Sequence, residues 1–274
     1  MTQKNLVASI IMAAGRGSRM KGYNGNKTLL PLIPGTTQFE GRRPFIHNIL
    51  ENLPKGPKCI VVNHHKKKVM EATSHFHVSY SEQKILNGTG GALLSCKPFL
   101  QMVNSESIII TMGDVPLVRK ETYLGLLAKL AAYHMAVLGF MPNSKRQYGL
   151  LELNGDTVNR IVEWKYWKDM PREYRERLSV CNSGIYAVKR DHLLEHLADL
   201  EHNPHNVEKQ INGKKRIINE YFLTDLVEIF SRNGKSVGYE VVKDPDEVMG
   251  VDDIEALLRA QQLYKSSEYG GQGG

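Results

Sequence analysis

Short apolar runs alternate along the chain with segments in which apolar residues recur every three or four positions. The runs have the length of buried strands and end in glycine or polar residues, whereas the periodic segments have the spacing of amphipathic helices. Strands that alternate with helices indicate an α/β fold, a Rossmann-like and mostly parallel sheet flanked by helices. We expect strands at residues 6–15, 59–65, 77–83, 107–114 and 136–142, and helices at 42–53 and 120–134.

The pattern changes at about Tyr148. Residues 149–164 alternate between apolar and polar on both sides of Asn154-Gly155-Asp156, which is the signature of a β-hairpin. A strand at 179–189, a helix at 220–234 and a C-terminal helix at 252–265 should follow, with a disordered tail at 266–274. No linker separates autonomous units, so we expect one domain over 1–265, with a first part at about 1–147 and a smaller, β-rich lobe at about 148–250.

The composition narrows the choice of partners. The chain has 36 Lys and Arg against 29 Asp and Glu, a net charge of +7 that suits nucleic acid, an anionic membrane or small phosphorylated molecules. The one dense basic run, at residues 66–68, has no interleaved aromatics, and no apolar run reaches the roughly 20 residues that span a bilayer. We therefore expect small phosphorylated substrates, with neither nucleic acid nor a membrane as partner. Three widely spaced cysteines form no disulfide framework, which favours a cytoplasmic protein.

A glycine-containing segment, MAAGRGSRM at residues 12–20, directly follows the first expected strand. Small residues let the backbone approach a ligand closely, and consecutive N–H groups can then bind phosphate oxygens. Arg19 adds a planar, permanently charged group that suits a polyphosphate. The spacing excludes two common phosphate loops, because Lys21 stands where a Walker A loop needs its first glycine and Met20 where a dinucleotide loop needs its third. A plain turn into a helix is the alternative for this segment taken alone.

The same segment resembles the signature loop of the sugar nucleotidyltransferase family, L-A-A-G-x-G-[ST]-R-[ML] followed by P-K-x-L. Here Met12 replaces the leucine, Asn26 replaces the proline, and Lys27 precedes the run LLPL at 29–32. The stretch between Pro34 and Arg43 is longer than in the family. The nearest branch is the uridylyltransferase domain of the bifunctional bacterial enzymes that make UDP-N-acetylglucosamine.

Further segments match this branch in its own order. They lie at residues 82–92, 112–117, 148–149, 161–165, 181–184, 220–225 and 250–252. Extra residues separate Gln83 from Gly88 in the segment that reads the base, so the side chain that contacts the base stays open. No hexapeptide periodicity follows, so the acetyltransferase domain of those bifunctional enzymes is not expected in this chain.

The resemblance implies a fold of the nucleotide-diphospho-sugar transferase type, with a nucleotide-binding part before about residue 147 and a sugar-binding lobe after it. It also implies an enzyme that transfers a nucleotidyl group from UTP to N-acetylglucosamine 1-phosphate, with Mg²⁺ as cofactor and pyrophosphate as second product. A sugar phosphate is already anionic, so positioning and charge neutralisation should dominate the barrier. The alternatives are a CTP-, dTTP- or GTP-dependent transferase for another sugar or alcohol phosphate, and a non-catalytic protein that binds nucleotide sugars.

The resemblance assigns roles to individual residues. Arg19 would hold the β- and γ-phosphates, and Lys27 would lie beside the α-phosphate or the sugar phosphate. Asp114 and Asp252 would bind the metal, since Mg²⁺ takes one or two protein carboxylates, although Asp252 could also cap the C-terminal helix. The residues expected around the nucleotide are Met12, Ala13, Ala14, Gly15, Gly17, Gln83, Gly88 and Thr89, and those expected around the sugar are Gly149, Glu163, Asn182 and Thr224. The oligomeric state is not predicted.

Overall fold

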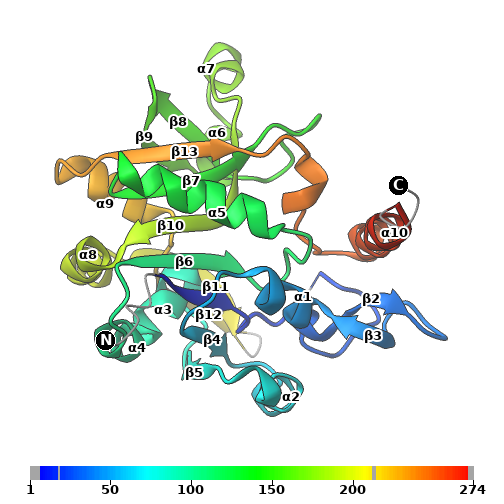
Figure 1. Ribbon diagram of the computed structural model, residues 1–274. Coiled ribbons are helices and arrows are strands. Elements are labelled where there is room, and N and C mark those ends of the chain that lie inside the picture. Colours follow the sequence, from blue (N-terminus) through cyan, green and yellow to red (C-terminus); the bar gives the residue numbers. More distant parts are fainter. Residues whose placement is uncertain (1–6, 18, 212–213, 271–274) are drawn as a thin grey trace.

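The computed structural model describes residues 7–17, 19–211 and 214–270, and its centre is a nine-stranded sheet (Figure 1). Strands β1, β4, β5 and β6 are parallel to one another, as are β7 and β13, whereas β10 runs antiparallel to both of its neighbours, β6 and β7. The order across the sheet is β13 (Val237–Val241), β7 (Met135–Phe140), β10 (Cys181–Lys189), β6 (Ser107–Met112), β1 (Val7–Met12), β4 (Lys58–Val62) and β5 (Ser79–Glu82). The hairpin of β8 (Leu150–Asn154) and β9 (Thr157–Val162) joins this sheet through a β8–β10 pair.

Helices flank the sheet, so the expected α/β class with a mostly parallel sheet is confirmed. The α-helices are α1 (Phe45–Asn52), α2 (Lys66–Ala72), α3 (Gly88–Ser95), α4 (Lys97–Met102), α5 (Lys120–Ala128), α6 (Trp164–Trp167), α7 (Arg172–Arg177), α8 (Arg190–His202), α9 (Asp225–Arg232) and α10 (Ile254–Gly270). Short 3-10 helices are η1 (Lys27–Leu29), η2 (Ser74–Phe76), η3 (Lys129–Ala131) and η4 (Pro245–Val248). Two small hairpins complete the fold, β2 (Pro31–Pro34) with β3 (Gly41–Pro44), and β11 (His205–Ile211) with β12 (Lys214–Glu220). No helix in the described part of the chain is long and apolar enough to cross a membrane.

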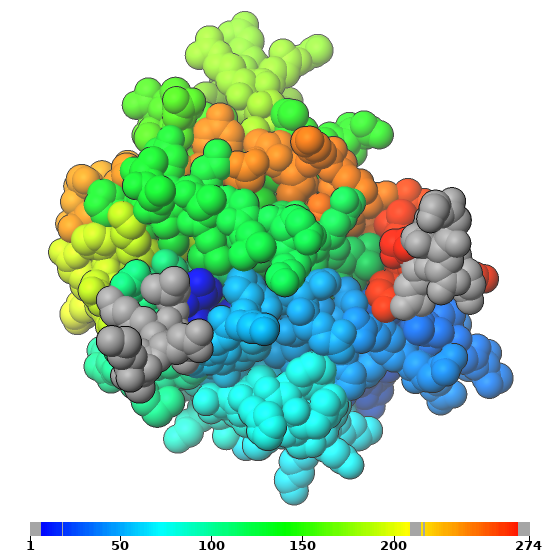
Figure 2. Space-filling view, in the orientation of Figure 1, coloured from blue at the N-terminus to red at the C-terminus, as the bar shows by residue number. Residues whose placement is uncertain are grey.

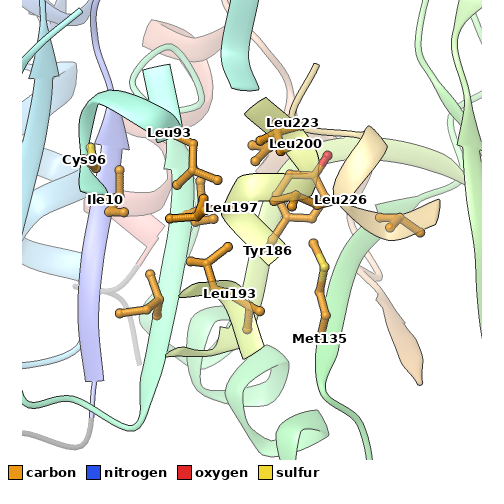
Figure 3. Packing of buried hydrophobic residues seen from close by; sticks show 14 of the residues in the cluster. Ile10, Leu93, Cys96, Met135, Tyr186, Leu193, Leu197, Leu200, Leu223 and Leu226 are labelled. Atoms are coloured by element: carbon orange, nitrogen blue, oxygen red, sulfur yellow. The ribbon is translucent and has the colours of Figure 1, made fainter. Parts of the chain in front are cut away.

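Successive residues of the central strands supply two separate hydrophobic clusters, because side chains alternate between the faces of a sheet. Ile10 packs in a cluster with residues of α3, α8 and α9, and its neighbour Ile11 packs in a second cluster with residues of α1 and α5. Figure 3 shows the first cluster, in which Leu93 and Leu197 lie between the strand that carries Ile10 and the strand that carries Tyr186. Burial on both faces explains why these strands are apolar without interruption in the sequence.

A third, smaller cluster joins the C-terminal helix to the start of the chain. Its buried residues are Met20, Leu30, Leu32, Phe45, Val251, Leu257 and Ala260. Helix α10 packs against β2, and Figure 2 shows the red C-terminal residues in contact with blue residues from the N-terminal part. The amide of Gln261 adds hydrogen bonds of 2.9 Å to the carbonyl oxygens of Pro31 and Gln38. This cluster therefore holds the segment before α10 against the loop that follows β1.

Some expected boundaries differ from the structure. The helix expected at 42–53 begins only at Phe45, because the preceding residues pair with β2 as strand β3. The helix expected at 220–234 begins only at Asp225, and the helix expected at 120–134 ends at Ala128 and continues as η3.

The C-terminal helix is also longer than expected. We predicted its end at residue 265 and a disordered tail at 266–274, but α10 continues to Gly270, so the boundary at 265 is wrong. The hydroxyl of Ser266 donates to the carbonyl of Gln262, and no glycine or proline occurs between Lys265 and Gly270 to end the helix. Residues 271–274 of the expected tail lie outside the described residues.

The third cluster predicts a contrast between two adjacent leucines of α10. Leu257 is 0% exposed and Leu258 is 52% exposed. We expect Leu257→Ala to lower the free energy of unfolding by about 2–5 kcal/mol, because truncation of a buried leucine leaves a cavity. Leu258→Ala, the matched control, should change it by less than about 0.5 kcal/mol. Urea unfolding of both variants measures the difference, and equal losses would show that the cluster does not hold α10 in place.

Candidate active site

The site begins where β1 and β6 end side by side. These strands are parallel, with Met12 opposite Met112 in the pairing, so the segments that follow them leave the sheet at the same edge. The amide of Gly113 donates to the carbonyl of Met12 at 3.0 Å, which keeps the two segments together. Ligands of open α/β sheets bind at this carboxyl edge. The loop after β1 and Asp114 after β6 therefore lie at the expected position for a ligand.

The loop after β1 is shaped by close packing against η1. Gly17 has a φ of +62°, and a Cβ atom added there would lie 2.6 Å from the Cγ atom of Lys27. Only glycine adopts this left-handed conformation without strain and leaves room for the lysine stem. Gly15 is exposed, and nothing lies within 4 Å of its virtual Cβ, whereas Ala13 and Ala14 are buried. The backbone around Gly15 is therefore the part of the loop that a phosphate could approach.

Lys27 lies between two carboxylates from distant parts of the chain. Its Nζ atom is 2.7 Å from Oδ2 of Asp114 and 2.6 Å from Oδ1 of Asp252, and it also donates to the carbonyl of Val251 at 3.2 Å. Arg19 contacts the second oxygen of the same aspartate, with 2.9 Å between its guanidinium and Oδ2 of Asp252. The structure thus brings together the four charged residues that the sequence predicted for catalysis and metal binding.

The protonation of Lys27 follows from this environment. Its side chain is only 11% exposed, and burial alone would lower the pKa of the ammonium. The carboxylates of Asp114 and Asp252 act in the opposite direction through charge and hydrogen bonds, and the net pKa is raised above the usual value for lysine. Lys27 is therefore a cation at neutral pH, and it fixes the separation of the two carboxylates.

The donor set around Lys27 suits a hard divalent cation. Carboxylate oxygens of Asp114 and Asp252 converge on one cationic atom, and Mg²⁺ is bound in proteins by one or two carboxylates plus phosphates and water. Among residues 7–17, 19–211 and 214–270, no group of three or more His, Cys, Asp or Glu side chains could hold a metal. The two aspartates fit a metal that takes most of its ligands from a phosphorylated substrate.

A cleft of about 230 Å³ leads from the two aspartates into the β-rich part of the chain. It is lined by Thr89, Met112, Asp114, Val115, Tyr148, Glu163, Asn182, Ser183, Gly184, Tyr186, Leu223, Thr224, Val248, Gly250 and Asp252. Three of the four residues predicted to bind the sugar lie on its walls. The fourth, Gly149, lies next to this wall, because its carbonyl accepts from the amide of Asn182 at 2.8 Å.

The polar groups of this cleft are fixed by neighbours. The Thr224 hydroxyl donates to Oε1 of Glu163 at 2.7 Å, and burial raises the pKa of that carboxyl above its usual range. The side-chain amide of Asn182 donates to the hydroxyl of Tyr186 at 2.8 Å, while its oxygen accepts from the amide of Gly184 at 2.9 Å. Such pre-oriented groups can discriminate between sugars by matching particular hydroxyls.

Only part of the segment predicted to read the base lies at the cleft. The amide nitrogen of Gln83 donates to the carbonyl of Gly88 at 2.9 Å and to Oδ1 of Asn87 at 3.2 Å, so it holds the residues inserted before Gly88. The Thr89 hydroxyl accepts from the amide of Leu223 at 3.1 Å. The structure thus places Thr89 at the cleft, whereas the Gln83 amide nitrogen is engaged within the loop.

Asn26 is a residue of the site whose role the sequence did not predict. Its amide nitrogen donates to the carbonyls of Ala13 and His64, both at 2.8 Å, and its oxygen accepts from the backbone and hydroxyl of Thr28. It is buried, it caps η1, and it joins the loops that follow β1 and β4. The available signal was the preference of asparagine for the position before a helix.

The chain is similar to known bacterial proteins. The bifunctional protein GlmU of Cereibacter sphaeroides is 29% identical over 264 residues, which are 94% of this chain and 52% of that protein. The bifunctional protein GlmU of Syntrophotalea carbinolica is 31% identical over 263 residues, 94% of this chain and 51% of that protein. The chain spans about half the length of the curated relatives it matches.

A solved structure, described as a "putative UDP-N-acetylglucosamine pyrophosphorylase" from Entamoeba histolytica, has the same fold with a TM-score of 0.69. It is 15% identical, and the match covers 97% of this chain and 82% of the other. The sequence model of the MobA-like NTP transferase domain matches residues 9–215. This match defines a nucleotidyltransferase, and the chain belongs to this family.

The geometry of the loop after β1 predicts a contrast between its two glycines. Gly17→Ala should lower the free energy of unfolding by more than about 1 kcal/mol, because φ is positive and the new Cβ meets the Lys27 stem. Gly15→Ala should leave it unchanged or raise it by about 0.5 kcal/mol, since its φ is not positive and no atom is near. Thermal unfolding followed by circular dichroism compares them, and a larger loss in Gly15→Ala would contradict this description of the loop.

Proposed function

We propose that the protein transfers the uridylyl group of UTP to N-acetylglucosamine 1-phosphate, with Mg²⁺ as cofactor. A phosphate oxygen of the sugar phosphate forms a bond to the α-phosphorus while the bond to the β-phosphate breaks, giving UDP-N-acetylglucosamine and pyrophosphate. One observation carries the proposal: Lys27 joins Asp114 and Asp252, and both aspartates line the cleft that also contains Glu163 and Asn182. In the proposed reaction both substrates reach this charged cluster, where their phosphates would react.

The charge distribution supports this reaction. Two highly anionic substrates must approach each other, so the largest part of the barrier is electrostatic. Arg19 is 69% exposed on its side chain and can turn from Asp252 to the departing β- and γ-phosphates. Lys27 stands beside the two carboxylates, at the position proposed for the α-phosphate and the sugar phosphate. Mg²⁺ bound to Asp114 and Asp252 would neutralise phosphate charge and orient the triphosphate.

The sugar half of the proposal rests on the cleft. Glu163 would accept from sugar hydroxyls, Asn182 would exchange hydrogen bonds with the sugar, and Gly149 would donate its amide. We propose that Thr224 acts mainly on Glu163, since its hydroxyl already donates to that carboxylate. The nucleotide-binding part at about 1–147 and the sugar-binding lobe at about 148–250 would then contribute the two walls of one active site.

The base half of the proposal rests on the resemblance to the uridylyltransferase branch. Gly88 and Thr89 would approach uracil from the start of α3, and Met12 to Gly17 would surround the phosphates. The inserted residues 84–87 are the place where another base could be preferred, because the Gln83 amide nitrogen holds this insertion. We extend the proposal to a cytoplasmic location, in line with three free, buried cysteines.

The substrate pair is tested by a pyrophosphate-release screen of UTP, CTP, GTP and dTTP against a panel of sugar 1-phosphates. We expect UTP with N-acetylglucosamine 1-phosphate to have the highest kcat/KM. Another nucleotide that is better by tenfold, about 1.4 kcal/mol of transition-state discrimination, would refute the base half of the proposal. Binding of nucleotide sugars without turnover of any pair would instead favour a non-catalytic protein.

The two aspartates provide a sharper test of the catalytic cluster. Asp114→Ala and Asp252→Ala should each lower kcat/KM by about 100-fold or more, because each removes an oxygen ligand from the metal and the triphosphate. Asp252→Asn should lose less than about tenfold, since asparagine keeps an oxygen ligand. The matched control is Asp253→Asn, whose side chain is exposed and caps α10 through the amide of Ala256. Activity of Asp114→Ala within a few-fold of the parent would remove Asp114 from the metal site.

A further inference from the structure

The ammonium of Lys27 occupies the position at which a cation can contact both site carboxylates. Oδ2 of Asp114 and Oδ1 of Asp252 point at the same Nζ atom, at 2.7 and 2.6 Å. A carboxylate oxygen that already accepts from a lysine at this distance can bind a divalent ion only if the two cations lie close together, which is repulsive. Lys27 and a metal therefore compete for this oxygen pair.

Arg19 contacts the carboxylate oxygen of Asp252 that Lys27 does not contact. Its guanidinium lies 2.9 Å from Oδ2, so both oxygens of that carboxylate have a cationic partner from the protein itself. Two carboxylates and two cations give the cluster a net charge of zero. A neutral cluster attracts a free divalent ion far less than a pair of unpaired carboxylates does.

Both cations are able to leave the carboxylates when a stronger anion arrives. The Lys27 ammonium is carried on a flexible four-carbon stem that lies over Gly17, and the Arg19 side chain is largely exposed. A triphosphate at the loop after β1 carries about four negative charges at neutral pH. Both cations can move from the carboxylates to its phosphate oxygens. Their movement would uncover the oxygens of Asp114 and Asp252 at the moment when phosphate oxygens are at hand to complete a metal shell.

We infer that Lys27 and Arg19 are internal counter-ions that oppose the binding of free divalent cations to the carboxylates of Asp114 and Asp252. The protein therefore binds its metal together with the triphosphate and not before it. This inference rests on the proposed function for the identity of the triphosphate. It deepens that function by setting an order of binding, in which the nucleotide is required for the metal. Lys27 thereby has a second role besides contact with phosphate.

The test is a titration of the full chain with Mn²⁺ alone, with free Mn²⁺ measured by electron paramagnetic resonance. Mn²⁺ prefers the same oxygen ligands as Mg²⁺ and is directly observed. We expect Lys27→Met to bind Mn²⁺ at least about tenfold more tightly than the parent, since it leaves two carboxylates without their shared cation. Lys27→Met combined with Asp252→Asn should lose this gain, because one of the two carboxylates is gone.

The matched control is Lys21→Met, which removes the same charge from an exposed position of the same loop. Its Mn²⁺ affinity should stay within about twofold of the parent, because an exposed charge is screened by solvent. Equal Mn²⁺ affinity of the parent and Lys27→Met would overturn the inference. An equal gain in Lys21→Met would overturn it too, because the gain would then follow from the lower net charge of the protein alone.

A second readout separates altered metal binding from altered folding. Mn²⁺ should raise the unfolding temperature of Lys27→Met and not that of the parent, because a ligand stabilises the folded state in proportion to its binding. Lys27→Gln should behave as Lys27→Met, which keeps the test valid if one variant folds poorly. The absence of a Mn²⁺-dependent shift of the unfolding temperature in both variants overturns the inference.

These measurements need no substrate. If Lys27→Met binds Mn²⁺ more tightly but the parent turns over no substrate pair, the proposed function alone is refuted. If the parent turns over a substrate pair but Lys27→Met shows no gain in Mn²⁺ binding, the counter-ion role alone is refuted.

Discussion

The ion cluster at Lys27 is the interaction on which the arrangement of the site depends. It joins residues 27, 114 and 252, which come from η1, the end of β6 and the segment before α10. A buried ammonium is costly unless it is paired, so the two carboxylates and the Val251 carbonyl have to be in place for Lys27 to remain buried. Leaving any one of these charges without a partner would cost correspondingly more than exchanging one partner for another. The cluster therefore selects a single packing of three segments that are otherwise loops or loop ends.

The apolar packing beneath the cluster makes that arrangement possible. Arg19 is followed by Met20, and Asp252 is preceded by Val251, and both of these apolar side chains are buried in the third cluster. Leu30, three residues after Lys27, is buried there too. Each of these three charged side chains thus begins within three residues of an anchored residue, so its backbone is held in place although its charged end is near other possible partners. Hydrophobic burial supplies the stability, and the ion cluster supplies the alignment.

The sequence predicted the central strands and the charged residues better than the small hairpins. Strands such as β1 and β6 are buried on both faces, so their apolar runs are unambiguous, and the motifs that follow them mark Lys27 and Asp114 directly. The hairpin of β11 and β12 escaped prediction because it lies outside the main sheet and has little apolar alternation, and one of its few apolar residues, Ile217, is 74% exposed. The hydrogen bonds of Asn26 and Gln83 could not be predicted either. Several of them join a side chain to backbone atoms of other segments, whose position depends on the tertiary fold.

The aspartate at position 252 shows why a sequence motif underdetermines the electrostatics of such a site. An asparagine at this position would also offer an oxygen ligand to a metal, so the ligand type alone does not distinguish the two residues. In this fold, however, the aspartate adds a full negative charge that is shared by Lys27 and Arg19, and it contributes to the raised pKa of Lys27. With asparagine, Lys27 would have one carboxylate partner and Arg19 would have none in this cluster. The extra charge therefore binds both cations inside the protein, and under the proposed function the triphosphate would have to compete with Asp252 for each of them.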